Sequence, residues 1–241
     1  MRMMPEASLL TRLQRLIETT YDWTTGIQSL APYLVGDHGY RVFYAGREIL
    51  EESPGDVEGP RTLVSWRGGP ISLSVYYPDA LVRHLEEVNP LKEVSDKNVV
   101  AFSLLVEELD HLLMLAWCAR HGRKVRLLEL EFHANVTKYF VLAHFLGRVM
   151  HRARLTSAER QWIHHCLFWE MGEGLPEPQG HRYRTAARLA MRFIRSLEAV
   201  SGVERVRALR RFARQSWSSQ RARLESADFA ARSGLLGALC G

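Results

Sequence analysis

The fold is decided by residues 95–154, which read SDKNVVAFSLLVEELDHLLMLAWCARHGRKVRLLELEFHANVTKYFVLAHFLGRVMHRAR. Apolar residues recur in this stretch at the spacing of amphipathic helices, and His121-Gly122-Arg123 interrupts them with a turn signal. The pattern therefore predicts two long helices joined at this turn. Polar and charged side chains are embedded among the leucines of this helix pair. They are Glu107, Glu108, Asp110, His111, Glu129, Glu131, His133, Asn135 and Lys138.

Residues 1–91 combine helical and strand patterns. Apolar and polar side chains alternate over residues 62–66 and 71–77, which is typical of two half-buried strands in a hairpin. Residues 40–50 predict one or two further short strands. A leucine-rich helical pattern over residues 5–18 precedes the strands, and a short helix follows them. We therefore expect an N-terminal α/β layer in which an antiparallel β-meander is flanked by helices.

Residues 92–225 contain no strand pattern and predict a mostly antiparallel bundle of about five helices. A capping box from Thr156 to Glu159 begins one of these helices, and residues 203–224 are expected to form the last one. Residues 226–241 are rich in small side chains and form a C-terminal tail. The fold class is therefore α+β, with a small sheet followed by a helical bundle.

The composition is that of an ordinary globular protein. The chain has 241 residues, of which 46% are hydrophobic and 24% are charged. Its three cysteines are widely spaced and form no Cys-x-x-Cys pair, which favours a reducing, cytoplasmic setting. No apolar run approaches the ~20 residues of a membrane helix, and the N-terminus lacks the apolar core of a secretory signal. We therefore expect no membrane partner.

The helix pair carries a candidate metal site. Glu107 and His111 are four residues apart and share a helix face, and Glu129 and His133 repeat this arrangement on the second helix. Carboxylates and imidazoles that project from facing helices are how helical bundles bind transition metals, so Fe, Mn or Zn is the expected ion. A turn near Gly122 would place the two histidines at the same level.

A second polar group lies on another face of the same helix. Glu131, Asn135 and Lys138 follow each other over two helical turns and could form a buried polar network, which is a frequent mark of a functional site. The alternative for both groups is a plain solvent-exposed helix face. Sequence spacing within one helix does not decide between these interpretations.

Arginine is concentrated near the C-terminus. Residues 182–223 contain twelve arginines and two glutamates, a net charge of +10, whereas the whole chain carries +5. The guanidinium group binds phosphates and carboxylates in bidentate fashion, so this block predicts an anion-binding face. The alternative is that carboxylates of the chain itself neutralise the block. The candidate binding residues are Arg184, Arg188, Arg192, Arg195, Arg207, Arg210, Arg211 and Arg214.

Two functional hypotheses follow. The sequence contains no phosphate-binding loop, dinucleotide-binding glycine motif, zinc-protease motif or serine-hydrolase elbow. The first hypothesis is therefore a non-enzymatic intracellular binding or adaptor protein that engages nucleic acid or an acidic protein through its arginine face. The second is a metal-dependent helical-bundle enzyme that uses the Glu/His residues of the central helices. An apolar stripe on the arginine helices could instead serve a homo-oligomer.

Overall fold

Two long helices, α4 (Val99–Arg120) and α5 (Leu127–Val149), form the centre of the computed structural model, as the sequence predicted. The chain reverses between them at Gly122, whose φ of +61° is a backbone conformation that glycine adopts without steric cost. The structure describes residues 8–44, 59–65, 72–152, 154–169, 174–200 and 202–226, with only the backbone at 43 and 44. The predicted tail lies outside these residues, except for Ser226.

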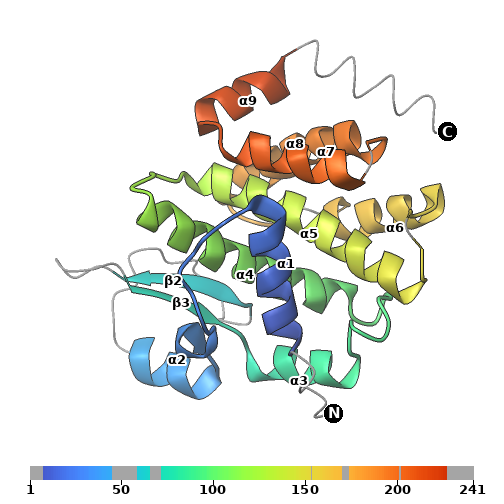
Figure 1. Ribbon diagram of the computed structural model, residues 1–241. Coiled ribbons are helices and arrows are strands. Elements are labelled where there is room, and N and C mark those ends of the chain that lie inside the picture. Colours follow the sequence, from blue (N-terminus) through green and yellow to red (C-terminus); the bar gives the residue numbers. More distant parts are fainter. Residues whose placement is uncertain are drawn as a thin grey trace, which may run out of the picture.

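The other elements surround this pair (Figure 1). Before it come α1 (Leu9–Tyr21), a 3-10 turn (Ala31–Tyr33), β1 (Leu34–Val35), α2 (Asp37–Tyr44), β2 (Arg61–Ser65), β3 (Ser72–Tyr76) and α3 (Asp79–Glu87). After it come α6 (Ser157–Phe168), α7 (Gln179–Glu198), α8 (Gly202–Ala213) and α9 (Trp217–Glu225). The sheet lies on the α4 side of the molecule, and α7, α8 and α9 lie on the α5 side.

The small sheet is mixed, so the predicted antiparallel meander is only partly correct. Strands β2 and β3 form the expected antiparallel hairpin, in which Leu63 lies opposite Ser74. Strand β1 pairs with the other edge of β3 in parallel, with Leu34 opposite Val75, and gives the order β1-β3-β2. A parallel pair needs a long crossover connection, which a meander does not contain.

The strands predicted within residues 40–50 are wrong in their first half, because residues 37–44 form α2. Asp37 stands in the first helical turn, where the helix dipole favours a negative charge. It also accepts a hydrogen bond of 2.8 Å from the Tyr76 hydroxyl, and Tyr40 packs against the ring of Tyr76. These contacts of β3 hold the segment as a helix, although its aromatic residues suggested strands. Residues 45–50 lie outside the described part.

The helical bundle also differs from the prediction of about five helices, since six run from α4 to α9 in the described residues. The predicted last helix is divided, because the Ser216 side chain accepts from the backbone N–H of Ser219 and begins α9. The predicted capping box of Thr156 and Glu159 is present at the start of α6. One hydrophobic cluster extends from Leu13 to Leu224, and the domain boundary at residue 91 stays a prediction.

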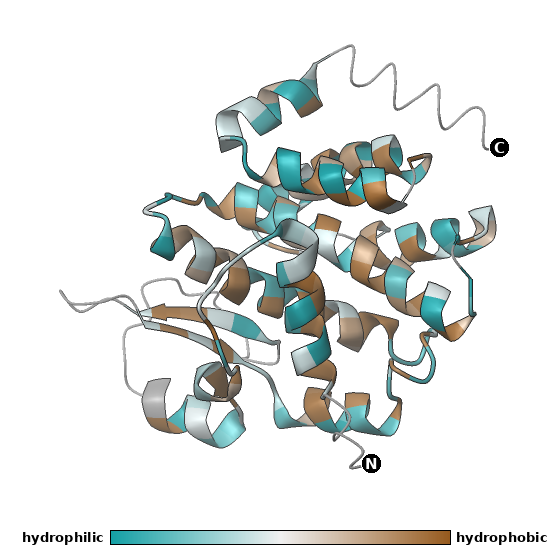
Figure 2. Ribbon diagram, in the orientation of Figure 1, coloured by the Kyte–Doolittle hydropathy of each residue, from teal (hydrophilic) through white to brown (hydrophobic). Residues whose placement is uncertain are grey.

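Helix α5 is buried along most of its length because α4 and α7 cover opposite sides of it. Ala186 and Ala190 of α7 are fully buried, and such small side chains allow a close approach of two helices. Apolar residues predominate along α4 in Figure 2, whereas α9 is mostly hydrophilic. Among the described residues, no helix combines the length and the apolar character needed to cross a membrane.

A chain of buried hydrogen bonds connects α1, α4 and α5. Asp110, which is 0% exposed, accepts hydrogen bonds of 2.8 Å each from His133 Nδ1 and from the Thr137 hydroxyl. Because that hydroxyl donates its single proton to Asp110, Tyr21 of α1 must donate to Thr137 across the remaining 2.9 Å contact. The His133 ring packs on Tyr21 and Trp23. These residues fix how the three helices are rotated against one another.

We predict that Asp110→Ala lowers the free energy of unfolding by about 3 kcal/mol, because two buried donors lose their acceptor. Urea denaturation followed by circular dichroism measures the change. Glu86→Ala is the control, since it removes a carboxylate from the exposed face of α3 and should change stability by less than about 0.5 kcal/mol. A loss below about 1 kcal/mol in Asp110→Ala would contradict the assigned role of the hydrogen-bond chain.

Candidate functional site

A second buried polar group lies further along the same helix interface, and we call it the Glu/His cluster. Its side chains come from three helices: α4, α5 and α7. They are Glu107, Glu108, His111, Glu131, Lys138 and Arg182. Glu107 and His111 are one turn apart on α4 and therefore face α5 together. Glu131 and Lys138 are two turns apart on α5 and meet them from the other side.

The geometry of the Glu/His cluster brings three ligand-type side chains together. Ligand atoms of Glu107, His111 and Glu131 all lie within 4.8 Å of one another. His111 Nε2 is 3.9 Å from Glu131 Oε2, which is too far for a hydrogen bond. Two ligands that are each about 2.1 Å from one ion lie roughly 3 to 4 Å apart, so a small ion fits between them.

The other nitrogen of His111 faces a different carboxylate. His111 Nδ1 lies 3.6 Å from Glu108 Oε2, and this carboxylate oxygen accepts a hydrogen bond of 2.7 Å from the Thr62 hydroxyl on β2. The Glu108 carboxylate lies on the Nδ1 side of the imidazole, and Glu131 lies on the Nε2 side. This arrangement is typical of metal-binding histidines, whose second nitrogen is usually held by a carboxylate or carbonyl group.

Several buried atoms of the Glu/His cluster have no hydrogen-bond partner. Among the described residues, these include His111 Nε2, Glu131 Oε2 and Arg182 Nε. The Arg182 atom is 3.8 Å from Glu131 Oε1, which is again beyond hydrogen-bond distance. Buried polar groups are nearly always paired, so atoms left unpaired in one place indicate that a ligand, an ion or water belongs between them.

The charges in the Glu/His cluster are unequal. Three carboxylates face two permanent cations, Lys138 and Arg182, and the Lys138 ammonium donates to Glu107 across 2.6 Å. Burial would lower the pKa of His111, but the close approach of the Glu108 carboxylate and the negative charges of Glu131 and Glu107 raise it to about 9. Without an added cation, the imidazole therefore takes up a proton to compensate the surplus acid.

The pKa values of the two carboxyl groups that face His111 are shifted in opposite directions. Burial raises the pKa of Glu131 to about 7, because the nearby His111 charge only partly compensates for it. Burial also opposes ionisation of Glu107, but the charges of Lys138 and His111 outweigh it and lower the pKa of Glu107. Glu107 is therefore held as a carboxylate, whereas Glu131 changes its protonation near neutral pH.

A cavity of about 440 Å³ reaches the Glu/His cluster from the surface. Glu107, Glu108 and Lys138 line it from the helix pair, and Tyr183 lines it from α7. His111 and Glu131 are not among the lining residues. A ligand of small-molecule size therefore meets Glu107 and Lys138 first.

The structure separates the residues that the sequence grouped as metal ligands. Glu107 and His111 are together, but Glu129 forms an ion pair with Arg123, and His133 binds Asp110. Glu131 takes the position that had been expected for Glu129.

The predicted polar network of Glu131, Asn135 and Lys138 lies at the same helix interface. Asn135 donates a hydrogen bond of 2.9 Å to the Glu131 carbonyl, and Lys138 reaches Glu107. Arg182 was missed as a member of the Glu/His cluster, and no local signal in the sequence places it opposite Glu131.

The eight predicted arginines do not form one free surface. Arg184, Arg207 and Arg214 form ion pairs with Glu177, Glu204 and Asp22 respectively. Arg192 donates to the Leu224 carbonyl, and Arg210 donates to two carbonyls of α1. Arg188, Arg195 and Arg211 are exposed and have no such partner within the described part of the chain.

In the described part of the chain, three arginines each donate to two main-chain carbonyls at the end of a helix. Arg210 donates to the Thr19 and Thr20 carbonyls at the end of α1. Arg205 binds the Leu197 and Val200 carbonyls at the end of α7, and Arg123 binds the Ala213 and Gln215 carbonyls at the end of α8. The last carbonyls of a helix lack partners within the helix, and each guanidinium supplies two donors to them.

The comparisons with known proteins give no assignment. No protein-family model, no curated protein and no solved structure matches the chain. A functional proposal therefore depends on the geometry of the Glu/His cluster and of the cavities.

We predict that Lys138→Met lowers the free energy of unfolding of the metal-free protein by about 3 kcal/mol at pH 7, because Glu107 is left as an unpaired buried charge. Since the pKa of Glu107 is lowered in the folded protein, the ion pair stabilises the fold at neutral pH. This stabilisation is lost as the pH falls through the pKa of Glu107. Urea denaturation at pH 7 and at pH 3 measures both effects.

The double variant Glu107→Gln/Lys138→Met is the matched control for this ion pair. It should recover at least about 1 kcal/mol relative to Lys138→Met, because neither charge then remains alone. Strictly additive losses from the two single substitutions would show that the pair contributes no coupling energy.

Proposed function

We propose that the protein is a metal-dependent enzyme that holds one divalent transition-metal ion between Glu107, His111 and Glu131. The observation that carries this proposal is the facing pair of unpartnered buried atoms, His111 Nε2 and Glu131 Oε2, with the Glu107 carboxylate beside them. One imidazole and two carboxylates form a donor set that suits Mn, Fe or Zn.

The surroundings of these three residues support a metal more than a simple polar core. Glu108 faces Nδ1 of His111, the ring nitrogen opposite the proposed metal ligand Nε2, where metal-binding histidines usually have a carboxylate or carbonyl partner. The surplus of carboxylates over Lys138 and Arg182 attracts a cation, and binding of the ion replaces the proton that His111 otherwise holds. Lys138 binds Oε2 of Glu107, and Oε1 of Glu107 remains as the donor to an ion.

Because the protein supplies three ligands, a bound ion would have coordination positions left for water or substrate. An ion with open positions acts as a Lewis acid that polarises an oxygen atom of water or substrate. Lys138 lines the cavity and supplies N–H donors that stabilise negative charge on that oxygen. The volume of about 440 Å³ suits a small-molecule substrate. Hydrolytic chemistry follows if the ion is Zn, and oxidative chemistry is open to Fe or Mn.

We predict that purified protein, reconstituted with Mn, Fe or Zn and then desalted, retains close to one equivalent of metal by elemental analysis. Glu131→Gln should retain less than about a tenth of this amount, because it replaces a charged ligand by a neutral amide of the same size. Glu129→Gln is the matched control, since Glu129 lies two residues away on α5 but pairs with Arg123. Its metal content should equal that of the wild type.

Less than a tenth of an equivalent in the reconstituted wild-type protein would overturn the proposal. Equal loss of metal in the Glu131 and Glu129 variants would also contradict the assigned ligand set. Circular dichroism of both variants separates a lost ligand from a lost fold.

A binding or adaptor protein for nucleic acid or an acidic protein is the second candidate function. Three exposed guanidinium groups without a partner in the described part favour it, those of Arg188, Arg195 and Arg211.

We predict that exchanging these three arginines for glutamate abolishes retention of single-stranded DNA or of polyglutamate in a mobility-shift assay at low salt. A triple exchange to lysine keeps the charge and should keep binding. Equal retention by the reversed variant would exclude this surface.

A further inference from the structure

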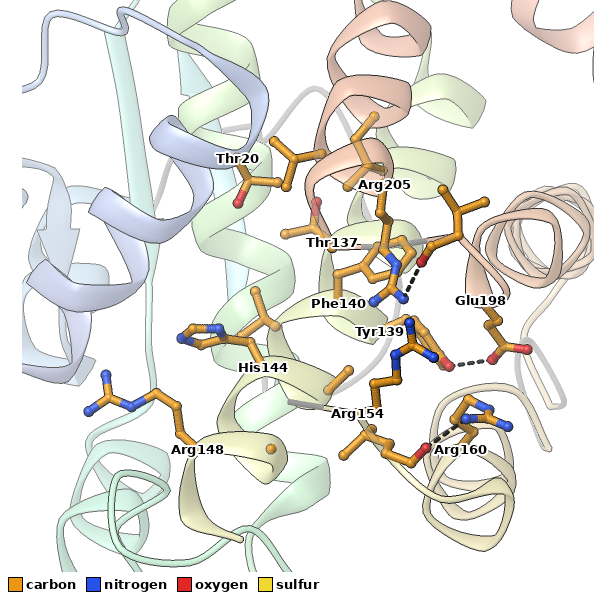
Figure 3. A pocket seen from close by; sticks show the side chains of 18 of the residues that line it. Thr20, Thr137, Tyr139, Phe140, His144, Arg148, Arg154, Arg160, Glu198 and Arg205 are labelled. Carbon is orange, nitrogen blue, oxygen red and sulfur yellow. Dashed lines mark hydrogen bonds between the residues drawn. The ribbon is translucent and has the colours of Figure 1, made fainter. Parts of the chain in front are cut away.

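A second, larger cavity lies on another side of α5, away from the Glu/His cluster. It has a volume of about 1600 Å³ and is bordered by α1, α5, α6, α7 and α8 (Figure 3). Tyr139 and Phe140 line it, whereas Lys138 lines the smaller cavity. The two cavities share no lining residue, so a ligand of the larger cavity is independent of the proposed metal.

The lining of the larger cavity is strongly basic. Six arginines border it, and Glu198 is the single carboxylate among the described residues that do so. The arginines are Arg148, Arg152, Arg154, Arg160, Arg195 and Arg205. Arg152 is paired with Glu159 outside the lining, but the remaining arginines leave a clear excess of positive charge. An excess of this kind in a concave site attracts an anion.

Three of these guanidinium groups belong to one local cluster, formed by Arg154, Arg160 and Arg205. Burial lowers the pKa of Arg205, the neighbouring Tyr139 and Glu198 oppose this, and the nearby positive charges of Arg154 and Arg160 lower it further. The like charges are therefore close enough to repel each other. Figure 3 shows Arg154 and Arg205 beside Tyr139 and Phe140, with Arg160 of α6 farther along the lining.

Two of the three arginines are held in place by the chain itself. Arg205 donates to the Leu197 and Val200 carbonyls and lies over the ring of Phe140. Arg160 donates a hydrogen bond of 2.7 Å to the Leu155 carbonyl and one of 3.1 Å to the Ser157 hydroxyl. These contacts keep the positive groups together without neutralising them, because the acceptors are uncharged. Such a preorganised group binds an anion at little entropic cost.

The one carboxylate is already engaged by neighbouring side chains. Glu198 Oε1 accepts hydrogen bonds from the Tyr139 hydroxyl and from His164 Nε2. The second ring nitrogen of His164, Nδ1, is buried and has no hydrogen-bond partner. Glu198 therefore offsets one of the three guanidinium charges, and a net charge of about +2 remains for a ligand.

We infer that this cavity binds the phosphate group of a small phosphate ester, with Arg154, Arg160 and Arg205 around the phosphate. A phosphate monoester is close to a dianion at neutral pH and so matches the residual charge, whereas a carboxylate leaves half of it uncompensated. Phe140, Val206 and Leu209 give the cavity an apolar wall for the organic part of the ligand. The concave shape favours a small molecule over a nucleic-acid strand.

Isothermal titration calorimetry with phenyl phosphate, inorganic phosphate and phenol tests this inference on the full-length protein. We expect phenyl phosphate to bind with a Kd below about 1 mM, inorganic phosphate to bind more weakly, and phenol to show no binding. Arg154→Gln should weaken phenyl phosphate binding at least about tenfold, because it removes a charged donor from the phosphate. Arg154 is exposed and has no partner among the described residues, so its loss should leave the fold intact.

Arg83→Gln is the matched control, since Arg83 is an exposed arginine of α3 that does not line the cavity. It should bind phenyl phosphate as the wild type does. Arg160→Gln provides a second variant within the cluster, with thermal unfolding as a check on its fold. Equal affinity in the Arg154 and Arg83 variants, binding of phenol as tight as that of phenyl phosphate, or no binding of either phosphate would overturn the inference. Retention of single-stranded DNA without binding of the small phosphates would also overturn it.

Discussion

The compensation of buried charge at the interface of α4 and α5 is the constraint on which the rest of the structure depends. A carboxylate in this position is tolerated only if a cation or several donors meet it. Asp110 is met by His133 and Thr137, Glu107 by Lys138, and Glu129 by Arg123. The contacts of Asp110 and Glu107 join α4 to α5, whereas Arg123 lies in the turn just before α5. The contacts between the helices therefore fix their rotation and register, which apolar contacts alone define less sharply.

The sequence was sufficient to predict the two central helices, their turn at Gly122 and the identity of most polar residues between them. It was not sufficient to predict their pairing. The spacing of Glu107 and His111 shows that they share a face of α4, but the face of α5 opposite them depends on how the helices rotate against each other. That rotation brings Glu131 to His111 and His133 to Asp110, and it turns Glu129 toward Arg123. It is set by contacts between side chains of different helices, such as Asp110 with His133 and Glu107 with Lys138, which spacing within one helix does not contain.

The same limit explains the errors in the N-terminal layer and in the arginine block. Residues 37–44 have strand-like aromatic content, but contacts with Tyr76 of β3 hold them as a helix. The arginines of α7 and α8 looked like one anion-binding face, yet most of those considered find acceptors within the chain. An excess of positive charge also lines the cavity beside Tyr139, to which Arg154, Arg160 and Arg205 come from three separate segments. Arg154 and Arg160 lie outside the block of high charge, so composition alone did not point to them.

The arginine forks at the ends of α1, α7 and α8 explain part of the strong preference of this chain for arginine over lysine. Arg210, Arg205 and Arg123 each donate hydrogen bonds to two main-chain carbonyls from one planar guanidinium group. The ammonium group of a lysine, on its flexible side chain, is less suited to bind two carbonyls at once. Exchange of these residues for lysine would keep the net charge and the isoelectric point while the helix ends lose their anchors. A substitution that scores as conservative by charge would therefore be selected against at these three positions and accepted at freely exposed ones such as Arg188.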